Sequence, residues 1–509
     1  MTLDQIVLGS SSKHHGIAFW PPPSTDERDP LRWPRWVKIV AVGAVALFNF
    51  TANFAGAGFS VATPVLEAQF QKTATQVNAL LTFNFLLLGI GNLFWIPIAT
   101  KLGKRFVLLV SMAILFGVLI WTAQAKTFNS LLAARCLSGF ASSAGESLVP
   151  EIVSDVFFLH ERAAMMSIYV LLTSGGSAVG PLIASFVVEL APETWRDFTW
   201  VCAGLAGFNL LAMYFFYPES NFRRPQVYEV AVTNEEKVKS STHLETATEK
   251  GEAPLGVQHV DHVQISWRRV WTSLIRTDST ITTVRAFIRP LLTLAYPSVL
   301  WAVILYGTSL ASQIILIFAF PSLLLAPPYL FAPSSVGLMQ IAALIGFLIA
   351  CFGGGYISDY ITARRIVRAG GSYFPEQRLV SLIPGAWIGS AGCIVVAFTC
   401  AYKLSWIGIA FGFGMLSFAT VFSPNIAITY VVESHPAVAS DCLVVINFFK
   451  NIVAFIFLYV AVDWVQKSGW IQVYMVMFML VTLAVLAALP LYFYGAKLRT
   501  NVDKRVEVA

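Results

Sequence analysis

Two charged side chains interrupt an apolar stretch of the chain and are the first candidates for chemistry. Arg135 and Glu146 stand eleven positions apart within residues 127 to 150, which contain no other Asp, Glu, Lys or Arg. At 100° per residue of helix, the two side chains point within about 20° of the same direction. A charge inside a membrane costs roughly 3 kcal/mol on insertion scales. We therefore expect both side chains to face an aqueous cavity.

The chemistry open to this pair is proton exchange. A desolvated Glu146 could take up and release a proton, and Arg135 could hold a neighbouring acid or a water network in one protonation state. The two lie about 16 Å apart along a helix axis, too far for a direct salt bridge. The alternative is structural: Arg135 bonds the carbonyl groups at a helix end, and Glu146 only meets water.

Two further polar clusters lie in apolar stretches. Lys450 stands with Asn447 and Asn451, and Asn49 stands with Asn53. Lys450 is either a substrate or coupling group, or a structural cation that extends toward the membrane interface. The asparagines either line a cavity or bridge helices.

Other chemical machinery is missing from the sequence. The seven histidines lie in termini or loops, so we expect no metal or haem cluster within the apolar stretches and no cofactor. There is no GxxxxGK[ST] phosphate-binding loop, which argues against ATP as the energy source. The six cysteines lie in or beside the apolar stretches, so we expect buried thiols without disulfides.

The elements that must position these residues follow from composition. Of 509 residues, 57% are hydrophobic and 12% are charged, whereas a soluble protein carries about 25% charged residues. This composition excludes a soluble multidomain protein and predicts helices that cross a membrane. Ten spans are free of charge, with two of them in the 69-residue stretch 290–358, which we expect to reverse near Pro321 to Pro333. Stretches 127–150 and 437–462, each with two charges, bring the total to twelve.

The basic residues predict the orientation. Twenty-seven Lys and Arg residues fall in the segments that would lie on one side and five on the other, so the positive-inside rule places both termini in the cytoplasm. The net charge of +6 therefore needs no nucleic acid as a partner.

The fold class predicted is an all-α membrane protein with two halves of six helices each. We divide the chain into an N-terminal tail (1–35), a first half (36–218), a central loop (219–289), a second half (290–495) and a C-terminal tail (496–509). The middle of the loop, 235–256, has the composition of a disordered segment. Residues 265–276 fit either a helix on the inner membrane face or an irregular loop.

Small residues mark the fifth span. Gly176, Gly180 and Pro181 would let another helix approach closely and would permit a kink, as a helix that repacks between two states requires. The alternative is ordinary glycine-rich packing.

Several short motifs together resemble those of the major facilitator superfamily, and within it the fungal twelve-span drug:proton antiporters. The resemblance covers about residues 29–495 and rests on motifs in register across both halves: Asp29 to Pro34, Gly103 to Arg105, Arg135 with Gly139, Asp155, His160 to Arg162, Gly176 to Pro181, Pro218 to Ser220, Asp359, and Pro375 to Leu379.

The resemblance assigns roles to residues of this chain. It implies that Arg135 is the fourth-helix arginine linked with proton transfer and that Gly176 to Pro181 are the antiporter motif. It also implies two gating loops, formed by Lys101, Gly103, Lys104 and Arg105 in the first half and by Asp359, Arg364 and Arg365 in the second. Two departures stand out: Thr100 replaces the usual acid of the first loop, and Ala184 and Ser185 replace glycines at the end of the antiporter run.

These features predict a proton-coupled secondary transporter that exports a small, amphipathic organic molecule across a fungal plasma membrane, as a monomer. We expect the first, fourth, seventh and tenth spans to form its cavity. The candidate contacts are Asn49, Asn53, Arg135, Glu146, Tyr306, Gln313, Asn425 and Lys450. The nearest rival is uptake of a polyamine or another organic cation by the same fold. A membrane enzyme such as an acyltransferase and a solute receptor are the rivals from other classes.

Overall fold

The computed structural model describes residues 29–190, 195–222, 283–368, 375–435 and 438–495, and all regular structure within them is helical. The long helices of the first half are α1 (Arg35–Gly58), α3 (Ala74–Leu102), α4 (Lys104–Gln124), α5 (Phe128–Val156), α6 (Leu159–Leu190) and α7 (Trp195–Phe216). Those of the second half are α11 (Pro297–Leu325), α13 (Gln340–Arg368), α14 (Ile383–Ala401), α15 (Trp406–Ser434) and α16 (Ala439–Leu486). The short helices are α2 (Thr63–Phe70), α10 (Thr283–Leu292) and α12 (Pro333–Leu338), together with three 3₁₀ segments at Pro30–Arg32, Thr293–Ala295 and Pro375–Leu382.

Within the described residues, eleven segments are long and apolar enough to cross a membrane. Helix α5 is not one of the eleven, because it carries Arg135, Glu146 and Glu151 along with several serines. It is nevertheless 29 residues long and packs against α3 and α4, so it is the twelfth crossing. The predicted fold of twelve helices is confirmed.

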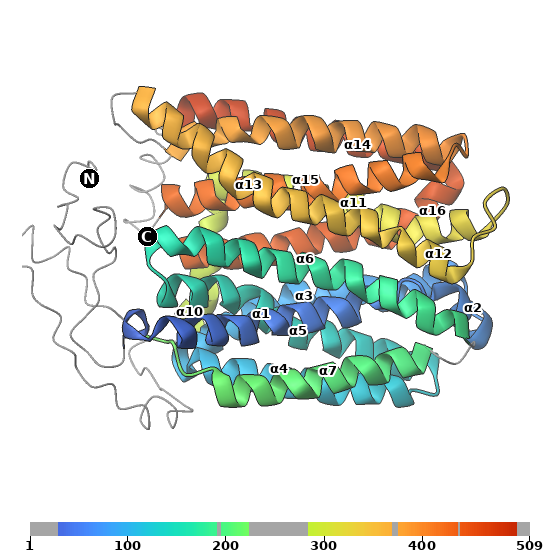
Figure 1. Cartoon of the computed structure of the whole chain (residues 1–509), viewed down its shortest axis with the longest axis horizontal. Coiled ribbons are helices and arrows are strands. Elements are labelled where there is room, and N and C mark those ends of the chain that lie inside the picture. Colours follow the sequence, from blue (N-terminus) through green and yellow to red (C-terminus); the bar gives the residue numbers. More distant parts are fainter. Residues whose placement is uncertain (1–28, 191–194, 223–282, 369–374, 436–437, 496–509) are drawn as a thin grey trace, which may run out of the picture.

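The two halves lie side by side, with α1 to α7 below and α11 to α16 above in Figure 1. The described chain begins and ends at the same end of the bundle, which we call the terminal end; the end that holds α2 and α12 is the opposite end. Helix α16 contains two crossings, because Gly469 breaks it with a φ of 74°. Such a positive φ strains any residue with a Cβ.

In the first half, α1 ends at Gly58 and α2 begins separately at Thr63, with a proline in its first turn. The segment expected to be the central loop (219–289) includes the start of a helix, α10 (Thr283–Leu292), which an Arg289–Asp441 ion pair of 3.0 Å holds against α16. The segments 235–256 and 265–276 lie outside the described residues.

Local sequence explains where the other helices start and stop. Thr73 and Gln76 form a capping box that starts α3. Gly103, with a φ of 100°, separates α3 from α4, which is why a glycine stands in this turn. The reversal predicted within 290–358 is confirmed, since α11 ends at Leu325 and Pro333 begins α12.

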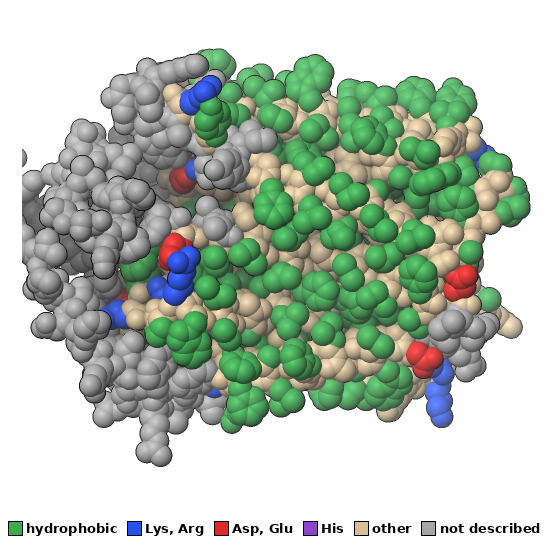
Figure 2. All heavy atoms as spheres, viewed as in Figure 1, with side chains coloured by type: hydrophobic (Ala, Val, Ile, Leu, Met, Phe, Trp, Pro, Cys, Tyr) green, Lys and Arg blue, Asp and Glu red, His purple; other side chains and the backbone are tan. Residues whose placement is uncertain are grey.

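The outer surface of the bundle matches a lipid environment. Hydrophobic side chains cover the middle of the face in Figure 2, and the visible charged side chains lie toward the two ends. Large apolar side chains are strongly exposed, for example Trp387 (75%) and Phe352 (71%). All six cysteines are free thiols; five are buried, as predicted, and Cys136 is half-buried. The chain is a multi-pass membrane protein.

Candidate functional site

A cavity of about 200 Å³ lies between the two halves. Its lining comes from α1, α3, α5 and α6 in the first half and from α11, α13, α15 and α16 in the second. The expectation of four lining helices was too narrow. The cavity follows the seam between the halves, so helices that flank the seam also contribute side chains.

An ion pair connects the two halves across this cavity. The Nζ atom of Lys450 on α16 lies 2.6 Å from Oε1 of Glu146 on α5. Lys450 also donates to the Tyr306 hydroxyl on α11 at 3.0 Å and lies 4.2 Å from the centroid of that ring. Lys450 is only 4% exposed. The Glu146 side chain is 16% exposed, so the lysine is buried and the carboxylate is partly buried, and removing either one would leave the other without its charged partner.

The second oxygen of Glu146 has different partners. Oε2 accepts hydrogen bonds from Nδ2 of Asn92 on α3 at 2.9 Å and from Nδ2 of Asn451 on α16 at 3.0 Å. The sequence analysis did not single out Asn92. The carboxylate is therefore held by three side chains at once, one on α3 of its own half and two on α16 of the other half, as expected of a group that links the two halves.

Arg135 does not line the cavity. Its guanidinium is 1% exposed and donates to the carbonyl oxygens of Ala55 and Gly56 at 3.3 and 2.9 Å, above the ring of Phe59. These carbonyls belong to the last turn of α1, where backbone acceptors have no partner in the helix and a cation is favourable. The expectation that Arg135 faces an aqueous cavity was wrong, because the 16 Å along α5 takes it past the cavity to the end of α1, where it bonds helix-end carbonyl groups as the structural alternative predicted.

The other predicted cavity contacts divide into two groups. Asn49, Asn53, Tyr306 and Gln313 line the cavity with Glu146 and Lys450. Asn425 does not; α15 contributes Thr420 and Val421 instead. Asn425 is five positions after Thr420, which turns its side chain by about 140° around the helix.

Some cavity side chains are already engaged in helix contacts. Nδ2 of Asn49 donates to the Gly145 carbonyl on α5 at 3.1 Å, and Nε2 of Gln313 donates to the Ser417 hydroxyl at 2.9 Å. Such bonds fix the positions of the side chains that a solute would meet.

The small residues of the fifth span allow α6 to pack directly on α1. A Cβ at Gly176 would lie 2.5 Å from the Phe50 carbonyl oxygen, and one at Gly180 would overlap the Phe54 carbonyl. Pro181 follows within the same helix. Backbone contact of this kind is possible only without side chains.

The first gating loop has an acid, but it comes from another part of the chain. The Glu219 carboxylate accepts from the backbone N–H groups of Lys104 and Arg105 at 3.1 and 3.0 Å. The Lys104 side chain pairs with Glu151 at 3.1 Å and Asp155 at 2.6 Å. Glu219 thus supplies a carboxylate to the start of α4, in the loop where Thr100 replaces the usual acid. Lys101 is half-buried in the last turn of α3.

The second gating loop is described in part. Asp359 and Arg365 lie in α13, but their side chains are outside what the structure describes. Arg364 is exposed and its guanidinium lies 4.5 Å from the ring centroid of Tyr360. Arg378 pairs with Glu433 at 2.8 Å, which repeats in the second half the pairing of Lys104 with Glu151.

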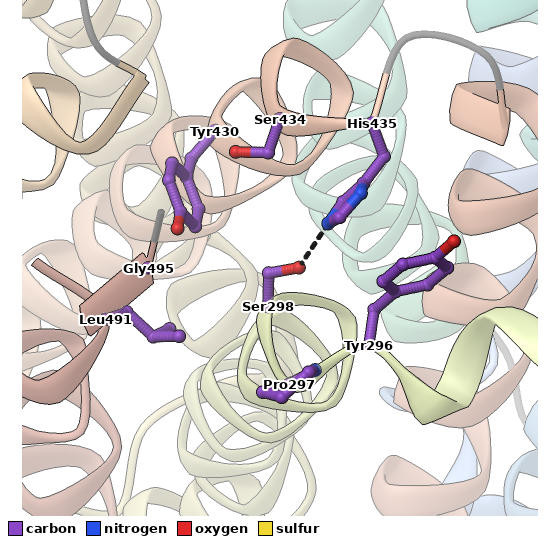
Figure 3. A pocket seen from close by; sticks show the side chains of 8 residues that line it. All are labelled: Tyr296, Pro297, Ser298, Tyr430, Ser434, His435, Leu491 and Gly495. Atoms are coloured by element: carbon purple, nitrogen blue, oxygen red, sulfur yellow. Dashed lines mark hydrogen bonds between the residues drawn. The ribbon is translucent and has the colours of Figure 1, made fainter. Parts of the chain in front are cut away.

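A second hollow lies at the terminal end of α11 and α15 (Figure 3), where the Ser298 hydroxyl and Nε2 of His435 form a hydrogen bond of 3.0 Å. Its volume is about 10 Å³, enough for roughly one water molecule. It is too small for an organic solute, so the cavity between the halves is the candidate substrate site.

Twelve membrane-crossing helices in two halves, around a central cavity with a linking ion pair, define a secondary transporter architecture. The chain belongs to the Major Facilitator Superfamily, whose family model matches residues 45–458.

Three fungal relatives cover most of the chain. Protein HOL1 of Saccharomyces cerevisiae is 26% identical over 543 aligned residues, which span 95% of this chain and 90% of the relative. An uncharacterized MFS-type transporter of Schizosaccharomyces pombe is 24% identical, over 97% of this chain and 90% of the relative. A protein of Aspergillus flavus named "Probable efflux pump" is 26% identical, over 77% of this chain and 86% of its own length.

Proposed function

We propose that this transporter exports a small, uncharged amphipathic molecule in exchange for protons, by alternating access of the central cavity. The observation that carries the proposal is the ion pair of 2.6 Å between Glu146 and Lys450. It joins the halves at the place where a solute would bind, and one of its members can take up a proton.

The lining of the cavity supports this class of solute. Apolar side chains such as Phe85, Ile314 and Phe347 alternate with the amides of Asn53 and other hydrogen-bonding groups. Such a surface suits a molecule with an apolar body and a few polar groups. The one acid and the one base of the lining neutralise each other, so an uncharged solute meets a site without net charge.

The coupling step would act on the pair itself. A proton on Glu146 removes its negative charge, which weakens its attraction to Lys450 and allows the halves to separate on one side. Lys450 would then keep its contacts with Tyr306 on its own half. When the proton leaves on the other side, the pair forms again.

Arg135 would act in a different way. It lies outside the cavity and contacts the end of α1, and it has no carboxylate partner among the described residues. We assign it the task of holding α1, whose residues Asn49 and Asn53 line the cavity, and we assign proton exchange to Glu146.

Export is supported by the direct packing of α6 on α1 at Gly176 and Gly180, the run that resembles the antiporter motif, and by the Aspergillus flavus relative named as an efflux pump. We place the protein in the plasma membrane with both termini in the cytoplasm, as the basic residues predict. The cavity is lined by a single chain, and we propose a monomer; the membership of a transporter family supports a transporter and not an enzyme.

Uptake of a polyamine is the alternative function. It would require acids to bind several positive charges, and among the described residues the cavity lining offers only Glu146, which Lys450 already neutralises. The uptake hypothesis assumes the same fold and predicts the opposite direction of transport.

Inside-out membrane vesicles test the proposal. Vesicles with wild-type protein should accumulate members of a panel of uncharged amphipathic compounds when their lumen is acidic, and a protonophore should abolish the accumulation. Vesicles from cells that lack the protein are the control. Accumulation of spermidine by right-side-out vesicles, with none of the panel compounds moving, would favour the rival instead.

A further inference from the structure

The two oxygens of the Glu146 carboxylate are not equivalent. Oε1 has one contact, with Nζ of Lys450 at 2.6 Å. Oε2 has two, with the amide nitrogens of Asn92 at 2.9 Å and Asn451 at 3.0 Å. A carboxylate oxygen offers two lone pairs to hydrogen bonds, so both lone pairs of Oε2 are engaged by N–H donors and one on Oε1 is open.

The amide of Asn92 is fixed in the orientation that donates. Its Nδ2 also donates to the Leu88 carbonyl oxygen at 3.0 Å, and a carbonyl oxygen can only accept. Its Oδ1 accepts the hydrogen bond of the Ser147 hydroxyl. A rotated amide would point oxygen at both Leu88 and Glu146, which would repel it. Asn92 is fully buried, so water cannot replace these contacts.

We infer that Asn92 is a positioning residue that reserves Oε2 of Glu146 for N–H donors and so directs the coupling proton to Oε1, where it removes the charge that attracts Lys450. The coupling role of this proton rests on the proposed function. Its position on Oε1 rests on the contacts of the two carboxylate oxygens described above. The proton comes from hydronium in the cavity and forms an O–H bond at Oε1. The ammonium of Lys450 keeps its three hydrogens and loses only a hydrogen bond.

This arrangement explains how one proton could release the contact between the halves. An O–H bond at the open lone pair of Oε1 removes the negative charge of the carboxylate, so Lys450 faces only a neutral hydroxyl oxygen, which is a much weaker acceptor. Lys450 has a second set of contacts on its own half, with the hydroxyl and ring of Tyr306. When Lys450 loses its partner on the opposite half, its ammonium group therefore still has a partner on its own half.

The Glu146→Gln variant tests the inference because a glutamine amide has one oxygen and one NH₂ group. If Asn92 reserves the Oε2 position for an acceptor, the glutamine must place its oxygen there and its NH₂ group against Lys450. The variant should then imitate the protonated state at every pH. In Asn92→Leu/Glu146→Gln, the amide with the fixed orientation is gone, and no second hydrogen bond among the described residues holds the Asn451 amide, so that amide can turn its oxygen to the glutamine NH₂ group. The glutamine can then offer its own oxygen to Lys450, which should restore the contact.

The readout is the distance between spin labels in protein embedded in nanodiscs, with the six native cysteines replaced and no solute or gradient present. One label pair is placed at the opposite end (Gln71→Cys and Lys467→Cys) and one at the terminal end (Arg35→Cys and Ile383→Cys). All four positions are exposed. In wild-type protein, acidification should increase the population with separated halves in one of the two pairs.

We expect Glu146→Gln to favour that population at neutral pH by about tenfold, the scale of one hydrogen bond to a charged group. Asn92→Leu/Glu146→Gln should return the ratio to the wild-type value. Asn78→Leu/Glu146→Gln is the matched control, since Asn78 is a buried asparagine on the same helix that does not contact Glu146, and it should behave as Glu146→Gln alone. Asn92→Ser/Glu146→Gln replaces the leucine variant if the latter does not fold.

Three results would overturn the inference: Glu146→Gln behaves as wild type, removal of Asn92 does not restore the ratio, or the Asn78 control restores it equally. The proposed function fails separately. If the label distances follow the prediction but solute accumulation ignores a pH gradient, the assignment of Asn92 stands and proton coupling does not.

Discussion

Gly337 on α12 lies so close to Ser185 on α6 that a methyl group at position 337 would overlap the serine hydroxyl. The two residues belong to different halves and meet at the opposite end of the bundle. Nearby, the backbone N–H of Ser334 donates to the Glu189 carboxylate at 2.9 Å. Ser185 is one of the two residues that stand in place of glycines at the end of the antiporter run, so this contact is a feature of the present chain.

Gly337→Ala should hinder closure of the halves at this end. We expect transport to fall at least about tenfold, because the added methyl group forces the helices apart at a cost of about 1 to 3 kcal/mol. Ser185→Gly/Gly337→Ala removes the obstructing side chain and should restore most of the activity. Transport by the single and double variants in vesicles measures both effects. A double variant as inactive as Gly337→Ala would show that the close contact is not the cause.

The Glu146 and Lys450 pair should show a characteristic pattern of stability. Lys450→Met leaves a buried carboxylate without its cation and should reduce stability by about 3 to 5 kcal/mol. Glu146→Gln/Lys450→Met removes both charges and should recover most of this loss while remaining unable to couple transport to protons. Thermal unfolding in detergent measures the stability. Losses that simply add up in the double variant would contradict a direct interaction.

Substitutions of Arg135 and of Glu146 should impair transport in different ways. Arg135→Lys keeps the charge but loses the two directed hydrogen bonds to α1, so we expect the maximal transport rate to fall about tenfold while the remaining transport still responds to a pH gradient. Glu146→Gln should lose that response. If Arg135→Lys transports solute at an undiminished rate but without regard to the gradient, Arg135 is part of the coupling machinery after all.

Glu219 should stabilise the start of α4. Glu219→Gln leaves one oxygen for the N–H groups of Lys104 and Arg105 and removes a negative charge from a helix N-terminus, so we expect a loss of about 1 to 2 kcal/mol. Glu67→Gln is the control, because Glu67 is a half-buried acid in α2 at the other end of the molecule. Equal unfolding temperatures for the two variants would argue against a capping role.

The sequence was sufficient for the fold because membrane spans are long, apolar and bounded by turn residues. It also placed Asn49, Asn53, Tyr306 and Gln313 at the cavity. It failed where the answer depends on distances between helices. Glu146 and Lys450 were both noticed as charges inside spans, but they are 304 positions apart, and no local pattern indicates that they meet.

The same limit explains Arg135 and Asn92. Helical periodicity predicted that Arg135 faces a cavity with Glu146, but it carries no information about which part of α1 lies opposite, and Arg135 meets the end of that helix instead. Asn92 is one of several uncharged polar residues in α3, and its role depends on Leu88, Ser147 and Glu146 being arranged around it. Only three-dimensional structure distinguishes it from Asn78.

The most direct test of proton exchange at Glu146 is to record proton movement as solute moves. Purified protein is reconstituted in liposomes that contain a pH-sensitive dye, and a transported compound from the panel is added on one side. We predict that wild-type protein moves protons in the direction opposite to the solute and that Glu146→Gln/Lys450→Met moves none. Solute flux without proton movement in the wild type, or equal proton movement in the double variant, would contradict the account.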